Sequence, residues 1–335
     1  MNYPVAYHRA MMLLMKAILF SQPGGPEVLT YGDAPDPIAS ADEMLVRVHA
    51  TAANRADTLQ RKGGYAPPEG ASPILGLELA GEVVRAAGEF NVGDRVMAVI
   101  TGGGYAELAT MPVGVAMRIP DVMSYEQAAA IPEVFLTAYL NLFRLGKLQA
   151  GETALIHAGA SGVGSAAIQL ARAAGAHAIA TTGTPAKVAF CESLGAQAIN
   201  YKTEHFAGRV QALTHGRGVD VVLDFVGAPY WNDNLKALAT NGRLMLIGML
   251  GGSSGPLDLG MIMGKRLTIT GTTLRRTPLP QKIALTREFE TFAMPRFASG
   301  ELKPIIDTVL PLSQAAEAHR RMEGNENIGK IVMMV

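Results

Sequence analysis

Residues 153–164 read TALIHAGASGVG, an apolar run that leads directly into a cluster of glycines. The residues that follow repeat apolar side chains at helical spacing, with Val163, Ala167, Leu170 and Ala174 on one face, before a second apolar run begins. Strand, glycine turn, helix and strand in this order let the backbone approach a pyrophosphate at a helix N-terminus. An ordinary strand-to-helix turn is the alternative for an isolated glycine cluster, but this context favours a dinucleotide site.

The chain changes character on either side of this loop. Downstream, apolar runs alternate with amphipathic stretches, as is typical of a parallel sheet covered by helices on both faces. We predict strands there at 153–158, 176–182, 219–226, 243–249 and 267–271. Upstream, short strands alternate with turns, and we predict them at 16–20, 45–50, 82–85 and 95–100.

The predicted fold class is α/β, with two domains. A Rossmann-type, doubly wound parallel-sheet domain spans residues 136–275, and a β-rich domain combines residues 15–135 with residues 276–335. The C-terminal part of the β-rich domain contains a helix near 281–298 and a final strand at 330–335.

The end of the second strand bears on which dinucleotide binds. Enzymes that use NAD usually place Asp or Glu about 20 residues beyond the glycine motif, where the carboxylate binds the ribose 2′-hydroxyl. Here the strand ends in Thr181, Thr182 and Gly183, without an acid. Thr184 can cap the next helix and Lys187 lies in its first turn, which would suit a 2′-phosphate. Lys187 could instead be an ordinary solvated helix residue, but the charge pattern favours NADPH.

Composition excludes several classes of protein. The 335 residues carry 29 Lys+Arg and 29 Asp+Glu, so the chain lacks the positive excess that a nucleic-acid partner requires. Cys191 is the only cysteine, which excludes internal disulfides and zinc sites with three or four thiolates. We therefore expect a reducing, cytoplasmic compartment.

Residues 1–14 end in a short apolar patch that is not built like a secretory signal. No apolar stretch is long enough to cross a membrane, so we expect no membrane partner. Residues 15–20 read MKAILF, a compact strand after a methionine. We therefore expect the natural start at Met15 and residues 1–14 to be an N-terminal extension.

Residues 76–81 read GLELAG, a G-x-E-x-x-G pattern in the β-rich part of the chain. Together with the domain order and the glycine loop, this pattern resembles the medium-chain dehydrogenase/reductase superfamily, whose β-rich catalytic domain is GroES-like. In the alcohol-dehydrogenase branch the residue after the first glycine is a zinc-binding histidine, whereas this chain has Leu77. Asn54 replaces the upstream ligand cysteine. The resemblance therefore implies that no metal is bound.

Further segments resemble the zinc-independent NADPH:quinone oxidoreductases, the zeta-crystallin-like family, and within it the branch of a tumour-suppressor-inducible quinone oxidoreductase. These segments are NRADTLQR at 54–61, YAPPEGAS at 65–72, AAAIPE at 128–133, IHAG at 156–159, NYK at 200–202 and NIGKIV at 327–332. The resemblance runs from Met15 to the C-terminus and implies a homodimer joined through edge strands of the nucleotide domain.

Carried over position by position, the resemblance implies three groups of cofactor-binding residues. The adenosine 2′-phosphate would lie among Gly183, Thr184, Lys187 and Tyr201. The pyrophosphate would lie near Thr137 and the loop Gly159, Ala160, Ser161, Gly162 and Val163. The nicotinamide half would be bordered by Ile247, Gly248, Met249, Leu250, Thr273, Leu274, Arg275, Asn327 and Lys330. Two positions depart from the family pattern, since Ser161 replaces a common glycine and Leu59 a common tyrosine.

The predicted reaction is hydride transfer from NADPH to a quinone held in the cleft between the domains. Hydride addition to a quinone gives a delocalised hydroquinone anion, so the Lewis acid that a simple ketone requires is dispensable. Asn54 and Tyr65 are the candidates to hydrogen-bond the quinone oxygens, with water as the final proton source. Tyr65 could instead only pack on the turn beside Pro67 and Pro68. We expect Asp57 and Glu78 to orient loops.

Two alternatives remain open. The first is an NADPH-dependent reductase of α,β-unsaturated ketones or aldehydes, in which a proton must also reach the α-carbon. The second is a non-catalytic NADPH-binding protein, because a fold does not by itself determine a function.

Overall fold

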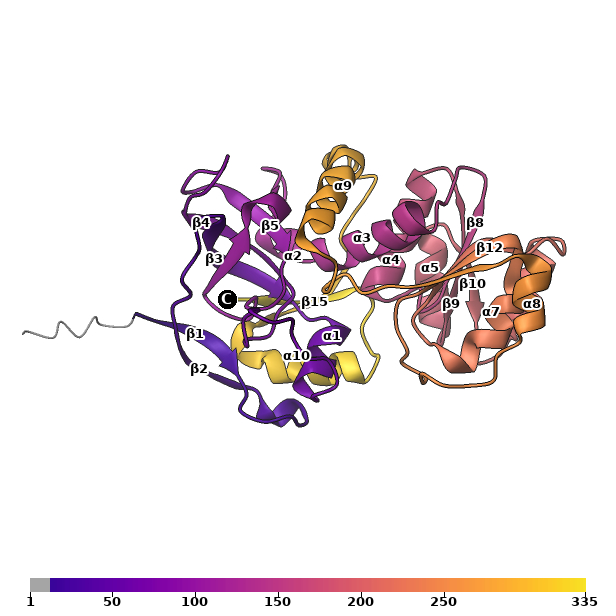
Figure 1. Cartoon of the computed structure of the whole chain (residues 1–335), viewed down its shortest axis with the longest axis horizontal. Coiled ribbons are helices and arrows are strands. Elements are labelled where there is room, and N and C mark those ends of the chain that lie inside the picture. The colour runs from indigo at the N-terminus through magenta and orange to yellow at the C-terminus, as the bar shows by residue number, and fades with distance from the viewer. Residues whose placement is uncertain (1–12) are drawn as a thin grey trace, which may run out of the picture.

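Six strands that are parallel to their neighbours form the sheet that contains the glycine loop (Figure 1). This computed structural model describes residues 13–335, so residues 1–12 of the predicted extension lie outside the described residues. The strands are β8 (Thr153–Ile156), β9 (His177–Thr182), β10 (Gln197–Asn200), β11 (Val219–Asp224), β12 (Leu238–Leu246) and β13 (Thr268–Gly271). Their order, β10-β9-β8-β11-β12-β13, reverses direction between β8 and β11, where open α/β sheets bind ligands.

Both faces of this sheet are buried, as the predicted doubly wound fold requires. In β8, Ala154 and Ile156 belong to one apolar cluster while Leu155 belongs to another on the opposite face. The covering helices include α4 (Gly162–Ala173), α5 (Pro185–Ser193), α6 (Phe206–Leu213), α7 (Trp231–Ala237) and α8 (Leu259–Lys265). Alternate residues of one strand therefore pack against helices on both sides.

The predicted strand at 243–249 is displaced in the structure, because β12 begins at Leu238 and ends at Leu246. The backbone N–H groups of Ile247 and Gly248 both donate to the carbonyl of Asp224, at 2.8 and 3.2 Å. The chain therefore turns back over the end of β11, and residues 247–250 form a loop.

The β-rich part builds a second sheet in the order β14-β15-β3-β4-β5-β7, with β6 paired to β3. Its strands are β3 (Glu43–Ala52), β4 (Glu78–Arg85), β5 (Arg95–Val99), β6 (Leu108–Pro112), β7 (Met117–Arg118), β14 (Ile306–Pro311) and β15 (Lys330–Met334). A separate pair contains β1 (Leu14–Leu19) and β2 (Thr30–Pro35). Because β15 pairs with both β14 and β3, the end of the chain returns to the sheet of the first third. The domain boundaries at 135/136 and 275/276 stay a prediction.

Helices α3 (Pro132–Tyr139), with a π-helical turn at Leu140–Leu145, and α9 (Leu279–Ser299) lie where the two sheets meet (Figure 1). The ring of Phe135 in α3 contacts the rings of Phe289 and Phe297 in α9, with centroids 6.4 and 5.0 Å apart. These aromatic residues belong to one apolar cluster that also contains Ala80 of β4 and Ile156 of β8. The two halves of the molecule therefore share a core.

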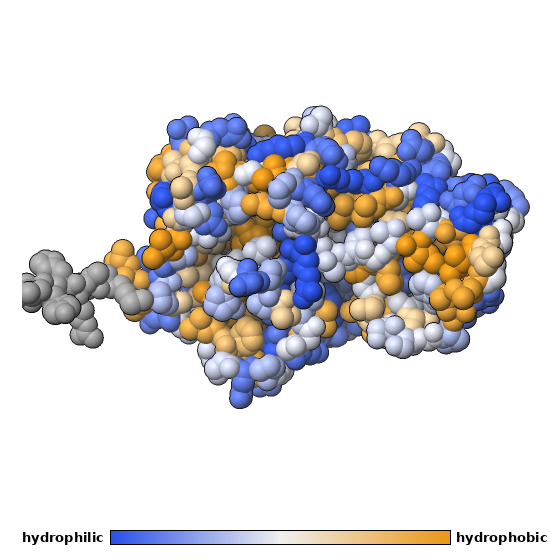
Figure 2. Space-filling view, in the orientation of Figure 1, coloured by the Kyte–Doolittle hydropathy of each residue, from blue (hydrophilic) through white to orange (hydrophobic). Residues whose placement is uncertain are grey.

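Three smaller helices complete the β-rich half: α1 (Arg55–Arg61), α2 (Tyr125–Ala129) and α10 (Ala315–Glu323). Figure 2 shows apolar side chains gathered at the end of the molecule where α7 and α8 lie. The segment from residue 249 to residue 263 contributes the exposed apolar side chains Met249, Leu250, Leu257, Leu259 and Met263. Across residues 13–335, no helix combines the length and the apolarity needed to cross a membrane.

Candidate active site

The glycine loop joins β8 to α4 and is closely packed. The Ser161 hydroxyl oxygen accepts a hydrogen bond from the Gly164 N–H at 3.0 Å and caps α4. A Cβ on Gly162 would lie 2.9 Å from Val134 Cγ1 and 2.8 Å from Lys330 Cδ, so a side chain has no space there. The Gly329 N–H donates to the Ala160 carbonyl at 2.9 Å, which ties the C-terminal segment to the loop.

Four residues predicted for the adenosine 2′-phosphate come together beside the end of β9. Thr184 caps α5 by accepting a hydrogen bond from the Lys187 N–H at 3.3 Å. A Cβ on Gly183 would lie 2.7 Å from the Tyr201 hydroxyl oxygen, so the tyrosine lies directly over the glycine. The Lys187 ammonium donates to the Asn325 carbonyl at 2.7 Å, and burial lowers the pKa of Lys187. Gly183 therefore lies beside the Tyr201 phenol and the N-terminus of α5, which carries Lys187.

Two of the predicted nicotinamide segments lie on loops at the carboxyl ends of β12 and β13. Met249 and Leu250 are exposed. Asn54 is predicted to bind the acceptor, and no hydrogen bond within residues 13–335 joins it to the 247–250 loop. Leu274 and Arg275 are buried. The Thr273 carbonyl accepts a hydrogen bond from the Thr277 hydroxyl. Thr137 of α3, predicted to lie near the pyrophosphate, is buried.

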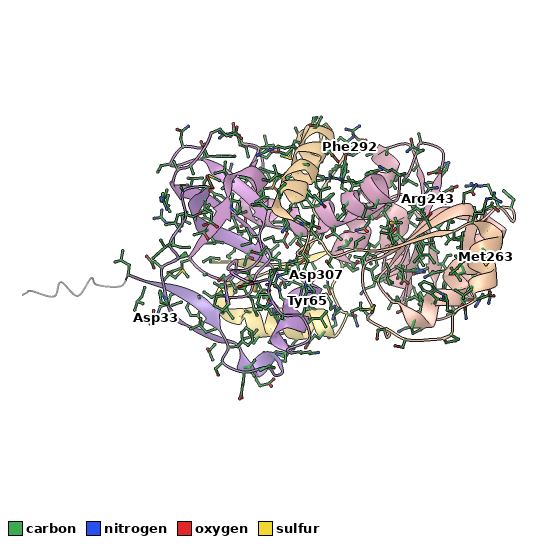
Figure 3. All side chains as sticks on the ribbon, viewed as in Figure 1. Asp33, Tyr65, Arg243, Met263, Phe292 and Asp307 are labelled. Carbon is green, nitrogen blue, oxygen red and sulfur yellow. The ribbon has the colours of Figure 1, made fainter. Side chains whose placement is uncertain are left out.

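Arg275 connects the two halves of the molecule. Its guanidinium donates from Nε and Nη2 to the Thr101 carbonyl at 2.9 and 2.6 Å. The same group lies over the Tyr65 ring, with Cζ 5.5 Å from the ring centroid. Figure 3 shows Tyr65 near the middle of the molecule, between the two sheets. Tyr65 therefore makes more than a turn contact, because its ring is a partner of a buried cation.

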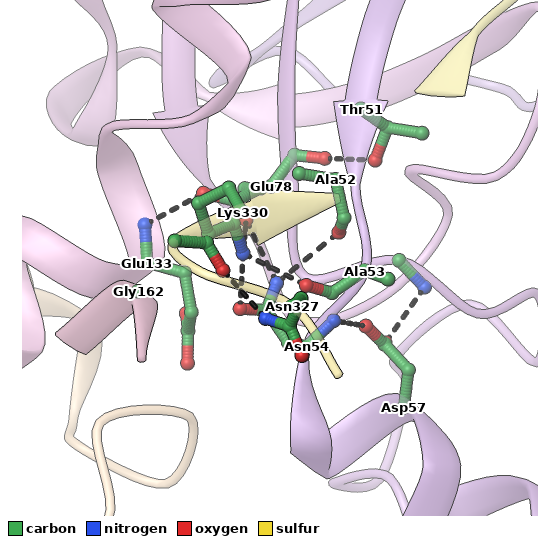
Figure 4. A network of polar contacts seen from close by, with 12 residues as sticks. Thr51, Ala52, Ala53, Asn54, Asp57, Glu78, Glu133, Gly162, Asn327 and Lys330 are labelled. Carbon is green, nitrogen blue, oxygen red and sulfur yellow. Dashed lines mark hydrogen bonds and ion pairs between the residues drawn. The ribbon is translucent and has the colours of Figure 1, made fainter. Parts of the chain in front are cut away.

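A buried polar cluster lies around Lys330 (Figure 4). The Lys330 ammonium contacts three oxygens: Glu78 Oε1 at 2.7 Å, Asn54 Oδ1 at 2.6 Å and the Ala53 carbonyl at 2.8 Å. All three N–H donors of the ammonium thus have a partner, which offsets the cost of burying the charge. Asn327 lies beside it and donates to the Gly329 carbonyl at 2.6 Å. We call Asn54, Glu78 and Lys330 the Lys330 cluster.

The side-chain amide of Asn54 is fully engaged in this cluster. Its Nδ2 donates to Glu78 Oε1 at 2.8 Å and to the Ala52 carbonyl at 3.2 Å. An acceptor oxygen that binds the Asn54 amide must therefore displace one of these partners. The role of Asn54 in substrate binding stays a prediction.

Asp57 and Glu78 hold backbone segments, as expected from the sequence. Asp57 accepts hydrogen bonds from the N–H groups of Asn54 at 2.8 Å and Gly76 at 3.2 Å, and from the Tyr105 hydroxyl at 3.2 Å. Burial raises the pKa of Asp57 to about 6. Glu78 Oε2 accepts the N–H of Glu133 at 2.9 Å, which joins β4 to the start of α3.

Glu133 lies next to the Lys330 cluster, and sequence reasoning did not single it out. Its carboxyl oxygen Oε2 is buried and has no hydrogen-bond partner within residues 13–335. Burial, together with the negative charge of Glu78, raises the pKa of Glu133 to about 8. The sequence signal is modest, a glutamate directly after a proline in the first turn of an apolar helix. Its burial depends on residues far away in the chain.

Within residues 13–335, no group of three or more His, Cys, Asp or Glu side chains is placed to hold a metal ion. Leu77 is buried at 1% exposure and offers no ligand atom. The metal-free chemistry itself stays a prediction.

Comparison with known proteins identifies both halves of the chain. A family model for the alcohol dehydrogenase GroES-like domain matches residues 40–121, and one for zinc-binding dehydrogenases matches residues 162–296. A quinone oxidoreductase of Pseudomonas aeruginosa is 36% identical over 329 residues, which are 96% of this chain and 100% of the relative.

Solved structures agree with this relation. The quinone oxidoreductase of Pseudomonas syringae pv. Tomato DC3000 has a TM-score of 0.85 and 33% identity, over 96% of this chain and 100% of the other. Escherichia coli quinone oxidoreductase complexed with NADPH has a TM-score of 0.84 and 30% identity, with the same two coverages. The chain belongs to the quinone oxidoreductase family of the medium-chain dehydrogenase/reductase superfamily.

Proposed function

We propose that this protein is an NADPH-dependent oxidoreductase that reduces quinones without a metal ion. The observation that carries the proposal is the continuity between the glycine loop and the Lys330 cluster. Lys330 packs against Gly162 through its aliphatic chain and bonds Asn54 through its ammonium. The residues predicted to hold the cofactor and those predicted to face the acceptor therefore form one connected structure. The relatives named quinone oxidoreductase, one of them solved with NADPH, support the same conclusion.

The residues present fit a bound NADPH. The N-terminus of α4, capped by Ser161, offers backbone amides and a positive dipole end to a pyrophosphate. The absence of side chains at Gly162 and Gly183 lets Val134, Lys330 and Tyr201 pack directly against the backbone at these two positions. Lys187 and Tyr201 would hold the 2′-phosphate, with no carboxylate of β9 to repel it. The 247–250 loop, residues 273–275, Asn327 and Lys330 would border the nicotinamide half.

Bound NADPH supplies a hydride, and the remaining tasks fall to side chains of this protein. Burial, with the nearby charge of Glu133, raises the pKa of Tyr65, so the phenol keeps its proton and can donate a hydrogen bond. The Arg275 guanidinium over the ring fixes its position. Asn54 and Tyr65 would hold the two quinone oxygens. Orientation of the acceptor by fixed groups supplies much of the acceleration in this scheme.

Reduction of α,β-unsaturated ketones or aldehydes is the second candidate, since the same cleft could present an activated alkene. A proton must then reach the α-carbon. If Tyr65 supplies it, Tyr65→Phe lowers enone reduction by a larger factor than quinone reduction, because only the enone needs a proton at carbon for a stable product.

The test is oxidation of NADPH by the full-length protein with a panel of ortho-quinones, para-quinones and 2-alkenals, repeated with NADH. We expect turnover of quinones with a strong preference for NADPH. Turnover of alkenals alone would show that the protein reduces α,β-unsaturated carbonyl compounds and does not reduce quinones. Tight NADPH binding without turnover of any acceptor would favour a non-catalytic NADPH-binding protein.

We further propose a cytoplasmic homodimer; assignment to the tumour-suppressor-inducible branch stays a prediction. Strand β13 lies at the edge of its sheet, and the neighbouring segment with α8 exposes Leu257, Leu259 and Met263. An unpaired edge beside exposed apolar side chains is typical of a surface that another chain covers. Light scattering should give twice the 35.3 kDa mass of the chain, and a monomeric mass would contradict the dimer.

A further inference from the structure

Two polar atoms near Tyr65 are buried and lack a hydrogen-bond partner within residues 13–335. They are Oε2 of Glu133 and Nη1 of Arg275. Buried polar atoms without partners are uncommon in native proteins, and each requires an explanation. The charges of both residues act on Tyr65, since Glu133 raises the pKa of its phenol and Arg275 lowers it. The two unsatisfied atoms therefore belong to the same region as the predicted acceptor site.

Glu133 also lies beside the glycine loop. The next residue, Val134, is the side chain that a Cβ on Gly162 would meet. One helical turn further on, Thr137 lies on the same face of α3 as Glu133. The Glu133 backbone N–H is fixed by Glu78 Oε2, while its carboxyl group points away from Glu78 and Lys330 (Figure 4). Glu133 therefore stands on the helix that borders the predicted cofactor loop, and its charge reaches Tyr65.

Several charged groups from different elements face this carboxyl group. Glu78 of β4 and Asp57 of α1 oppose its ionisation, whereas Lys330 of β15 and Lys282 of α9 favour it. Tyr65 and Arg275 also sense its charge. Burial outweighs the attraction of the cations and raises the pKa to about 8, so the group keeps its proton at neutral pH. The residue as a whole is partly exposed, whereas its Oε2 atom is buried.

We propose that Glu133 is the proton donor of the reaction and acts directly on the reduced acceptor. This proposal rests on the proposed function. The acceptor gains two electrons and one hydrogen with the hydride and becomes an anion. The O–H bond of the Glu133 carboxylic acid then breaks, and its proton forms a new O–H bond on the hydroquinone anion. The electron pair of the broken bond stays on the Glu133 carboxylate, which takes a proton from water before the next turnover. Because Oε2 has no hydrogen-bond partner among residues 13–335, it is free to carry this proton.

The test compares Glu133→Gln with two controls. Glu126→Gln makes the same change in the first turn of the adjacent helix α2, and Tyr65→Phe removes the phenol but keeps the acid. We expect wild-type kcat/KM with a quinone to fall above a pH of about 8. In Glu133→Gln this fall should disappear and kcat should drop by about 10²–10⁴, the usual contribution of a general acid. Glu126→Gln should match the wild type, and Tyr65→Phe should keep the fall above that pH.

Two readouts do not depend on turnover. In infrared difference spectra of wild type minus Glu133→Gln, a protonated carboxyl band should be present at pH 6 and lost above about pH 8. The dissociation constant for NADPH, measured by fluorescence, should stay within about twofold, because an exchange of similar size removes only the acid. An ionised carboxylate at pH 6, or a Glu133→Gln enzyme with wild-type rate and pH profile, would overturn the proposal.

Failure of the proposed function gives a different result. If the wild type reduces no quinone or alkenal at any pH, the function and the donor role fall together, even when the carboxyl band titrates as described. If the wild type turns over and only the Glu133→Gln prediction fails, the function stands and the donor role alone falls.

Discussion

Lys187 is the side chain that we propose discriminates between NADPH and NADH. It lies in the first turn of α5, one turn from Gly183, and its ammonium contacts the Asn325 carbonyl at 2.7 Å. A lysine at a helix N-terminus adds its charge to unpaired backbone amides, a combination suited to a phosphate group.

The substitution Lys187→Glu should raise the KM for NADPH by about ten- to a hundredfold and change that for NADH by less than about threefold. Only NADPH carries the 2′-phosphate that the new carboxylate repels, and each 1.4 kcal/mol of lost binding corresponds to a factor of ten. Lys236→Glu, on the surface of α7, is the matched control and should change neither constant. Steady-state kinetics with both cofactors decide the point, and equal effects on the two would remove Lys187 from the phosphate site.

Asp57 shows how a buried acid in the site links stability to pH. Its folded pKa of about 6 lies above the ordinary aspartate value of 3.8, so between these pH values the folded state binds more protons than the unfolded state. Stability contributed by this group is therefore complete below about pH 4 and is lost as the pH rises to about 6.

As the pH rises from 4 to 6, the wild type should lose the stability that depends on Asp57, whereas Asp57→Asn has no such group to titrate. The free energy of unfolding of the variant should therefore rise relative to that of the wild type. The gain should be on the order of 2–3 kcal/mol, because one pKa unit corresponds to about 1.4 kcal/mol. Urea unfolding at several pH values measures this difference. A difference that does not vary with pH would show that Asp57 is ionised in the folded protein throughout.

The glycine loop and α3 act as one structural unit, because Gly162 has no space for a side chain between Val134 and Lys330. Gly162→Ala should lower stability by about 1–3 kcal/mol, as overpacking does, and weaken NADPH binding. Gly264→Ala in α8 is the control. A Cβ there meets no atom within 4 Å, so alanine should be neutral or slightly stabilising. Thermal unfolding and NADPH titration of both variants test this, and unchanged binding in Gly162→Ala would contradict the close packing of the loop.

Elements whose signals are local were predictable from the sequence. The β8–α4 unit and the cap at Thr184 follow from neighbouring residues, and the structure contains both within a few residues of their predicted bounds. The strand at 243–249 was displaced because two amides are captured by Asp224, a partner more than twenty positions away. The edge strand β7 has only two residues, too few to show a pattern.

The same distinction applies to the candidate site. Gly183, Thr184 and Lys187 are consecutive or one turn apart, so their proximity could be predicted. Asn54 and Lys330 lie 276 positions apart and meet only because β15 returns to β3. The unsatisfied oxygen of Glu133 depends on packing among α3, β4 and α9, which no local pattern encodes.

The whole molecule brings two sheets against α3 and α9 and shares one apolar core between them. This arrangement lets the C-terminal strand contact the glycine loop at Gly329 and the β-rich sheet at Asn54. The resemblance implies that Leu77 and Asn54 stand at zinc-ligand positions of the metal-dependent branch, and the Asn54 amide oxygen accepts a hydrogen bond from Lys330. We propose that this assembly passes a hydride from NADPH to a quinone without a Lewis acid.

The most direct test is the kinetic isotope effect with NADPH deuterated at the transferred position, measured on full-length protein that has been dialysed against chelator and shown to be free of metal. We predict that removal of metal leaves the rate of para-quinone reduction unchanged. The rate should be lower with deuterated than with ordinary NADPH, and the oxidised cofactor should no longer contain deuterium. Loss of activity on metal removal, with recovery on addition of zinc, would contradict the account.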